Sequence, residues 1–308
     1  MKMKKNKFVI SILIIFSIVL TGCSLPGLSG SDKNSISVGT ISTSESQIVG
    51  QVIRQLIEEE TDLTVEMVNN LGSSIVVHQA MVNGDVDISA TRYTGTDLAG
   101  ALKMEPVMDA EKAMEIVQTE FQKQFNQKWY DSYGFENSYA FTITAELAEK
   151  ENIEKVSELK SLAGDLAFGV DNSWLNRKGD GYEGFVEEYG FEFGNAFPMQ
   201  IGLVYQAAAS GDMDVVLAYT TDGRIKAFDL KVLEDDHNFF PPYETSAVAS
   251  NDILEKHPEI DELLERLVGK IDTEMMQELN YEADGEMREP AIIAKEFLEE
   301  NNYFRDEE

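Results

Sequence analysis

The chain has 308 residues, 43% of them hydrophobic, and a formal charge of −31 at pH 7. This hydrophobic content is that of a globular protein, which excludes extensive disorder, and the length is too great for one compact core. The negative charge excludes nucleic acid as a partner, because its phosphates would be repelled. Such acidity is typical of a soluble protein that associates weakly with itself.

The N-terminus has the pattern of an export signal. Four lysines precede an apolar run from Phe8 to Leu20, and the run closes with Leu20-Thr21-Gly22-Cys23. The run is shorter than the roughly 20 residues that cross a bilayer, so residues 1–22 are predicted to be a cleaved signal peptide. Cleavage before Cys23 would make the chain's only cysteine the new N-terminus. The alternative is an ordinary cleaved signal in which this cysteine is incidental.

The cleavage sequence resembles the bacterial lipobox, which implies a thioether-linked diacylglycerol on Cys23. The predicted location is therefore the extracytoplasmic face of the cell membrane, with the protein anchored there by lipid. Residues 23–34 are rich in Gly, Ser and Pro and are predicted to form a flexible tether. The folded part is expected to start near Ile36. An acylated Cys23 leaves no cysteine for a disulfide or a thiolate nucleophile.

The elements that follow alternate between strands and helices. Short apolar runs predict strands, and apolar residues at helical spacing predict helices. The expected strands are 35–39, 64–69, 86–90, 138–144, 166–170, 213–218 and 230–233. The first expected helix follows an N-cap region at 43–45 and ends at residue 60. The other expected helices are 73–82, 109–125, 156–163, 176–189, 253–257, 260–270, 272–281 and 291–299. This alternation predicts an α/β fold with mostly parallel sheets.

Two distant segments of the chain share a pattern. Residues 79–88, Gln-Ala-Met-Val-Asn-Gly-Asp-Val-Asp-Ile, are echoed by residues 206–215, Gln-Ala-Ala-Ala-Ser-Gly-Asp-Met-Asp-Val. Each segment is predicted to be a helix end, with Gly84 or Gly211 at a position that favours left-handed dihedral angles. The echo predicts two similar α/β lobes.

Each echoed segment enters an apolar strand that ends in a tyrosine, Tyr93 in the first copy and Tyr219 in the second. Ligands of open α/β sheets bind outside the carboxyl ends of the strands. Two facing lobes would therefore place both tyrosines in one cleft.

The chain lacks the sequence signatures of common enzyme and metal sites. Its three histidines are scattered, and it has no Walker loop, G-x-S-x-G, H-E-x-x-H or dinucleotide-binding glycine motif. Asp85 with Asp87, and Asp212 with Asp214, are candidate acid–base pairs. Because both pairs fall in the echoed Gly-Asp-x-Asp segments, they are better explained as helix-to-strand turns. We therefore expect no catalysis, no metal and no cofactor.

Four of the eleven tyrosines stand where a ligand could contact them. Besides Tyr93 and Tyr219, Tyr139 lies at the start of an expected strand, and Tyr243 follows two prolines that restrict the preceding loop. A quaternary ammonium has no N–H to donate, but a desolvated aromatic face attracts it by about 2 kcal/mol. Each tyrosine also has an ordinary interpretation as a packed or rim residue.

Six segments together carry a specific similarity. They are Ile-Ser-Ala-Thr-Arg-Tyr-Thr-Gly-Thr-Asp-Leu at 88–98, Asp-Ser-Tyr-Gly-Phe at 131–135, Gly-Val-Asp-Asn-Ser-Trp-Leu at 169–175, Met-Gln-Ile-Gly-Leu-Val-Tyr at 199–205, Thr-Asp-Gly-Arg-Ile at 221–225 and Phe-Pro-Pro-Tyr at 240–243. The chain resembles the glycine betaine/carnitine/choline-binding lipoproteins of bacterial osmoprotectant ABC importers. The similarity runs from the lipobox-like sequence that ends at Cys23 to the C-terminus.

The resemblance implies a two-lobed substrate-binding protein with the type II periplasmic-binding-protein-like fold, in which hinged lobes enclose a ligand cleft. We assign residues 35–133 and 235–308 to lobe I, which is discontinuous, and residues 134–234 to lobe II. Ligand capture is expected to close the lobes. The closed form is expected to dock on a membrane permease, and a cytoplasmic ATPase is expected to drive release.

The resemblance also implies an aromatic cage. Its positions match Tyr93 and Tyr243 in lobe I, and Tyr139 and Tyr219 in lobe II. Thr96 corresponds to a position where choline-restricted relatives carry Asp, so Thr implies the broad range of glycine betaine, carnitine and choline.

The preferred ligand stays open at this point, because Ile41 stands where the family often carries Gln as a polar contact. One alternative keeps the fold and binds another trimethylated betaine, such as ergothioneine. The other is an extracellular hydrolase of small cationic substrates that uses a carboxylate pair. The missing nucleophile, metal and histidine patterns disfavour it.

Overall fold

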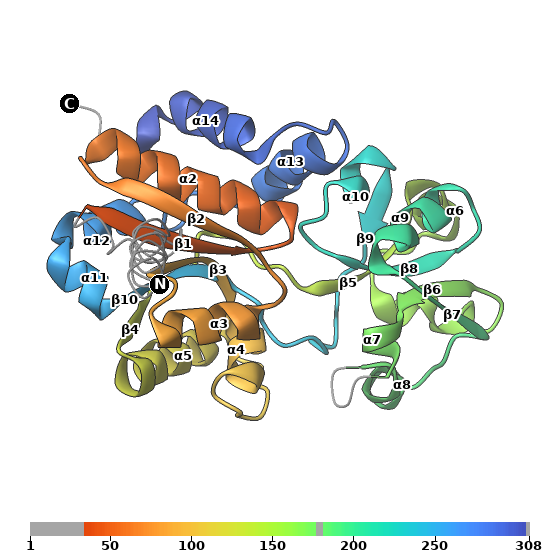
Figure 1. Cartoon of the computed structure of the whole chain (residues 1–308). Helices are drawn as coiled ribbons and strands as arrows, with labels where there is room; N and C mark the ends of the chain where they lie inside the picture. Colours follow the sequence, from red (N-terminus) through yellow and green to blue (C-terminus); the bar gives the residue numbers. More distant parts are fainter. Residues whose placement is uncertain (1–33, 177–180, 306–308) are drawn as a thin grey trace, which may run out of the picture. The chain divides into compact units, whose positions relative to one another are not determined.

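The computed structural model describes residues 34–176 and 181–305. The described chain from Ile36 onward holds two five-stranded sheets (Figure 1). The α/β class is confirmed, and each sheet with its helices makes one lobe. The boundaries assigned to the two lobes stay a prediction.

The first sheet, called sheet I, has the strand order β2-β1-β3-β10-β4. Its strands are β1 (Ser35–Ile41), β2 (Thr64–Leu71), β3 (Ile88–Tyr93), β4 (Gln127–Trp129) and β10 (Thr245–Ser250). β1 pairs in parallel with β3, whereas β10 runs antiparallel to both β3 and β4. The elements around it are α2 (Ser44–Glu60), α3 (Ser74–Asn83), α4 (Thr94–Gly100), α5 (Ala110–Phe125), α11 (Asn251–Lys256), α12 (Pro258–Glu265), α13 (Thr273–Asp284), α14 (Pro290–Glu300) and the 3₁₀ turn η3 (Asn302–Phe304).

The second sheet, called sheet II, has the strand order β7-β6-β8-β5-β9. Its strands are β5 (Tyr139–Thr144), β6 (Ala167–Asp171), β7 (Asn195–Met199), β8 (Val215–Tyr219) and β9 (Leu230–Val232). β6 is parallel to β7 and β8, whereas β5 is antiparallel to β8 and β9. Its helical elements are α6 (Ala145–Glu151), η2 (Val156–Ser161), α7 (Asn172–Leu175), α8 (Tyr182–Tyr189), α9 (Ile201–Ala209) and α10 (Arg224–Ala227).

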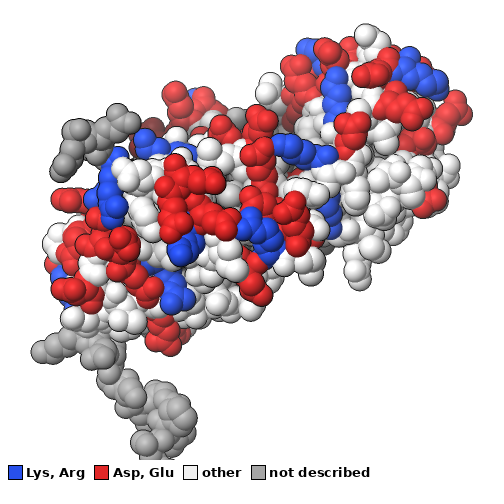
Figure 2. All heavy atoms as spheres, turned by 90° about the horizontal axis from the view of Figure 1, so that it is seen from above, with Lys and Arg blue, Asp and Glu red and all other residues white. Residues whose placement is uncertain are grey.

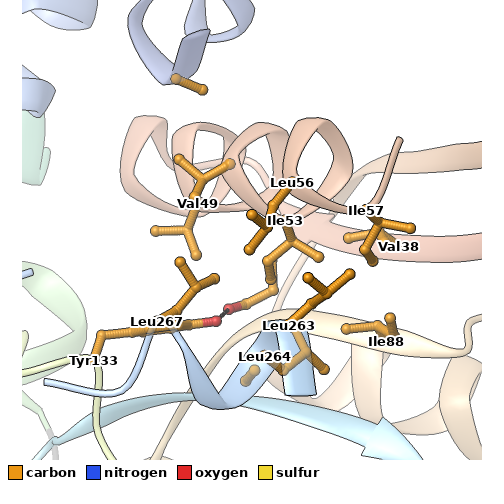
Figure 3. Close-up of a cluster of buried hydrophobic side chains, with 14 of the residues drawn as sticks. Val38, Val49, Ile53, Leu56, Ile57, Ile88, Tyr133, Leu263, Leu264 and Leu267 are labelled. Atoms are coloured by element: carbon orange, nitrogen blue, oxygen red, sulfur yellow. Dashed lines mark hydrogen bonds between the residues drawn. The ribbon is translucent and has the colours of Figure 1, made fainter. Parts of the chain in front are cut away.

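Both faces of sheet I are covered by helices, and its buried side chains alternate between the faces. Ala247 and Ala249 of β10 pack into a cluster with α2, α12, α13 and α14, whereas Val248 packs on the opposite face with α5. Figure 3 shows part of the first cluster, where α2 lies over the sheet. The buried apolar residues of α2 fall at helical spacing and form one face: Ile48, Val49, Val52, Ile53, Leu56 and Ile57.

The expectation of mostly parallel sheets is wrong, because both sheets are mixed. β5 and β10 are the strands that the chain enters directly after it passes from one sheet to the other. Parallel pairing follows when a crossover helix returns the chain to the end of its own sheet at which the preceding strand began. No such helix precedes β5 or β10, and each runs antiparallel to its neighbours.

Several local expectations are also corrected. The helix expected at 176–189 begins at Tyr182, where Gly181 has extended backbone as the N-cap, and residues 177–180 lie outside the described chain. The helix expected at 156–163 is the 3₁₀ turn η2. Strands β4, β7 and β10 are not anticipated, since β4 and β7 are short and β10 is built largely of Thr, Ser and Ala.

The echoed segments have the same backbone structure. α3 and α9 are each followed by a glycine with left-handed dihedral angles, φ being 78° at Gly84 and 77° at Gly211. The strands that follow, β3 and β8, end in Tyr93 and Tyr219. The sequence prediction for these two turns is confirmed.

The second aspartate of each copy ties its turn to the neighbouring strand. The Asp87 carboxylate accepts the backbone N–H of Ser37 in β1 at 2.8 Å, and the Asp87 N–H donates to the Ser37 carbonyl at 3.1 Å. Asp214 repeats this exchange with Ala167 of β6, at 2.8 and 2.9 Å. These contacts give the aspartates a structural role.

Candidate functional site

A cavity of about 700 Å³ lies where the strands that carry the echoed tyrosines end. This volume is within the range of small-molecule sites. Ile41, at the end of β1, forms part of its wall. The wall also includes all five residues predicted to contact the ligand: Tyr93, Thr96, Tyr139, Tyr219 and Tyr243.

Each sheet has one tyrosine at the end of a strand and a second tyrosine on the neighbouring antiparallel segment. In sheet II, Tyr219 ends β8 and lies opposite Tyr139, the first residue of β5, with ring centroids 5.1 Å apart. In sheet I, Tyr93 ends β3 and lies opposite Thr245, the first residue of β10. Tyr243 precedes Thr245 by two residues. The two tyrosines of each sheet therefore come from adjacent antiparallel chain segments.

A close backbone approach positions Tyr243. The Pro242 carbonyl accepts the backbone N–H of Gly95 at 3.1 Å and the hydroxyl of Thr94 at 3.0 Å. A Cβ atom on Gly95 would lie 2.8 Å from this carbonyl oxygen and 3.0 Å from the Tyr243 ring. Only glycine fits there without displacing the loop, so the start of α4 and the Pro-Pro-Tyr loop are interlocked.

Aromatic residues support the tyrosines of sheet II. The Tyr139 ring lies 5.9 Å from Phe240 and 6.5 Å from Trp174, a fully buried residue. The backbone N–H of Tyr219 donates to the hydroxyl of Tyr205 at 3.0 Å. Ring packing therefore contributes to holding this half of the site.

A buried carboxylate supports Tyr93 in sheet I. The Tyr93 hydroxyl donates to Oε1 of Glu45 at 2.7 Å, and Nδ2 of Asn137 lies 3.3 Å from each Glu45 oxygen. Thr221, in the segment after β8, also hydrogen-bonds to Glu45 through its hydroxyl. Burial raises the pKa of Glu45, although these donors oppose the shift. Burial and the Glu45 charge hold the pKa of Tyr93 well above its usual value, so Tyr93 keeps its proton.

Sequence reasoning missed Glu45 as a site residue. It stands in the first turn of α2, after the Thr43 N-cap, where an acidic residue is ordinary because it complements the helix dipole. Only the three-dimensional contacts distinguish it.

Acidic side chains are spread over the face of the molecule shown in Figure 2, with Lys and Arg among them. Within residues 34–176 and 181–305, no group of three or more His, Cys, Asp or Glu side chains is placed to hold a metal ion. In the same part of the chain, no helix is both long and apolar enough to traverse a bilayer. Cys23, the predicted lipidation site, lies outside the described residues.

Comparison with known proteins gives consistent matches. Residues 34–300 match the family described as the substrate binding domain of ABC-type glycine betaine transport systems. The chain is 54% identical to the carnitine transport binding protein OpuCC of Listeria monocytogenes over 97% of this chain and 98% of that protein. It is 31% identical to the Helicobacter pylori ergothioneine transport permease/ergothioneine binding protein EgtU, over 97% of this chain and 53% of that protein.

A solved structure supports the same assignment. The crystal structure titled as a glycine betaine/carnitine/choline ABC transporter superposes with a TM-score of 0.85 at 54% identity, covering 88% of this chain and all of that chain. The fold is therefore the two-lobed type II binding-protein architecture that the sequence predicts. The chain belongs to the family of substrate-binding domains of ABC-type glycine betaine transport systems, and it is a transport binding protein rather than an enzyme.

Proposed function

We propose that the chain captures quaternary ammonium osmoprotectants in the cavity of about 700 Å³, with Tyr93, Tyr139, Tyr219 and Tyr243 as an aromatic cage. The observation that carries the proposal is that these four tyrosines, distant in sequence, line one cavity. Each ring face contributes about 2 kcal/mol toward a desolvated cation. Micromolar binding requires about 8 kcal/mol net, which several rings and the burial of the methyl groups can supply.

The proposed ligands are glycine betaine, carnitine and choline. The proposal is supported by the relative named for carnitine transport, at 54% identity, and by the solved relative titled for all three compounds. Thr96 and Ile41 line the cavity and are the proposed positions that tune preference among them. Ergothioneine is the second candidate, favoured by the match to a relative named for its transport.

We also propose how the protein is deployed. Residues 1–22 act as the signal peptide, Cys23 carries the lipid, and residues 23–34 form the tether to the outer face of the cytoplasmic membrane. Ligand binding closes lobe I (35–133 and 235–308) on lobe II (134–234). The closed form then delivers the ligand to permease subunits powered by a cytoplasmic ATPase.

Calorimetric titration against a ligand panel tests the proposal. The panel contains glycine betaine, carnitine, choline and ergothioneine, each compared with the analogue that lacks one N-methyl group. The trimethylated compound is expected to bind at least severalfold more tightly, because the dimethylated cation regains an N–H that loses its water without gaining a ring contact. Saturable binding without turnover is expected. Absence of binding to every trimethylated compound would refute the proposed function.

A further inference from the structure

The buried carboxylate of Glu45 lies directly behind the wall of the cavity. Glu45 is 2% exposed, and its partners Tyr93 and Asn137 both line the cavity. Its three hydrogen-bond donors come from the end of β3, from the segment that leads from sheet I to sheet II, and from the segment after β8. Glu45 thus joins parts of both lobes at the cage.

We propose that Glu45, as an ionised carboxylate, makes the cavity selective for positive charge and fixes the Tyr93 face of the cage. This inference rests on the proposed function and adds a specificity-determining residue to it. Glu45 acts through its charge and through Tyr93, so it is a positioning residue and not a contact residue of the cage.

The contacts of Glu45 fit the ionised form. Tyr93 donates to one oxygen, and the Asn137 amide nitrogen faces both oxygens, so both carboxylate oxygens act as acceptors. The Thr221 hydroxyl is a further donor to the side chain. A protonated carboxyl would instead have to donate its own O–H, and the Asn137 amide could accept it only by turning its oxygen toward Glu45 and withdrawing the Nδ2 donor.

The charged groups that line a smaller neighbouring cavity together with Glu45 do not neutralise it. Arg224 directs two of its nitrogens to Asp222, at 2.8 and 2.6 Å. Asp222 adds a like charge, and Asp284 at the end of α13 accepts the Ser44 hydroxyl beside Glu45. Burial removes the water that would otherwise stabilise the Glu45 charge. A ligand cation in the cavity would stabilise that charge instead.

The bond to Tyr93 carries part of this effect into the cage. A phenol that donates to a carboxylate is polarised, so its ring becomes more electron-rich. The face of such a ring attracts a cation more strongly than that of an unpolarised phenol. The same bond restricts the rotation of the Tyr93 side chain, which keeps that face toward the cavity.

The test uses Glu45→Gln, which keeps the shape of the side chain and removes its charge. The probes are choline and its neutral carbon isostere, in which carbon replaces the nitrogen. Glu45→Gln is expected to bind choline about tenfold more weakly at pH 7.5 and to bind the isostere as the wild type does. Glu59→Gln makes the same charge change at the far, exposed end of α2 and should bind both compounds as the wild type does.

Two further readouts separate this role from a merely structural one. Because burial raises the pKa of Glu45, its ionised form opposes folding at neutral pH, so Glu45→Gln should melt at the same or a higher temperature without ligand. Choline affinity of the wild type should fall as pH is lowered from 7.5 toward 5, whereas that of Glu45→Gln should not. The Asn137 side chain can turn so that its Oδ1, which has no hydrogen-bond partner, accepts an N–H of the new amide group in the Glu45→Gln variant.

The outcomes are distinct. Equal choline affinity for wild type and Glu45→Gln, or an equal loss for choline and the isostere, would overturn the inference while the proposed function stands. If the wild type binds no trimethylated compound, the proposed function itself fails. Should Glu45→Gln not fold, the wild-type pH profile tests the charge and Tyr93→Phe tests the contact. Choline affinity that does not change with pH in the wild type would overturn the role of the Glu45 charge. Unchanged choline affinity in Tyr93→Phe would overturn the role of the contact between Glu45 and Tyr93.

Discussion

The two halves of the proposed tyrosine cage share a backbone plan but hold their rings by different means. In sheet I, Tyr93 is hydrogen-bonded to a buried carboxylate, and Tyr243 is fixed by the contact between Gly95 and Pro242. In sheet II, Tyr139 packs against Tyr219 and lies near Trp174 and Phe240. Polar and backbone contacts support the first half, and ring contacts support the second together with the hydrogen bond from Tyr219 to Tyr205.

This difference shows what an internal repeat preserves. The echoed helix, glycine turn and strand place a tyrosine at the same point in each lobe, because turn geometry fixes where the strand ends. The repeat does not preserve the neighbours of that tyrosine. The residue two positions after it is Gly95 in one copy and Thr221 in the other, and Thr221 hydrogen-bonds to Glu45, which supports Tyr93 in the opposite half.

The largest effect is expected from removing a ring face in the half held by packing. Tyr219→Ala should weaken choline binding by about 1–2 kcal/mol, roughly tenfold or more, because one cation–π face is lost. Tyr219→Phe keeps the ring and should retain most of the affinity. Calorimetric titration of both variants checks this ordering. Equal affinities for wild type and the alanine variants of all four tyrosines would refute the cage.

The convergence of the predicted contact residues on one cavity could be anticipated from sequence, whereas the residues that support them could not, and the cage itself stays a prediction. Tyr93 and Tyr219 end apolar strands in an echoed pattern, Tyr139 starts an expected strand, and Tyr243 follows two prolines. The family resemblance matched these four to a cage and added Thr96. All five line one cavity.

The residues that support the cage carry no distinctive local signal. Glu45 resembles any acidic residue in the first turn of a helix, and its role depends on contacts with residues far along the chain. β10 is equally hidden, because its small residues lack the bulk that usually marks a strand. The mixed sheets follow from β5 and β10, whose direction depends on how the chain passes between the lobes.

An intermediate effect is expected from a single methyl group in the half held by backbone contacts. Gly95→Ala would place a Cβ atom 2.8 Å from the Pro242 carbonyl and 3.0 Å from the Tyr243 ring, so the loop must move. Choline affinity should fall about threefold to tenfold, because a small displacement of one ring reduces its attraction for the cation. Gly72→Ala is the matched control, since its Cβ would meet no atom within 4 Å. Unchanged affinity in Gly95→Ala would show that the position of Tyr243 is not critical.

The smallest effect is expected where the chain passes between the two halves. Glu136 and Glu244 face each other in an antiparallel bridge between the two connecting segments. The pKa of Glu244 is raised by burial and by the charges of Glu136 and Asp131. The ionised form of Glu244 therefore lowers the free energy of unfolding. This destabilisation is absent below the unfolded-state pKa of the carboxyl, and it appears as pH rises through the folded-state pKa.

Glu244→Gln removes that cost and should raise the melting temperature by about 1–2 °C at pH 7.5, a small change because the side chain is only half-buried. At pH 4 the wild-type carboxyl is protonated, so the two proteins should melt together. Exposed Glu66, changed to Gln, controls for the overall charge and should match the wild type at both values of pH. Thermal melts of the ligand-free proteins measure all three. If Glu244→Gln instead melts below the wild type at pH 7.5, the contacts of Glu244 stabilise the connection between the lobes more than its buried charge weakens it.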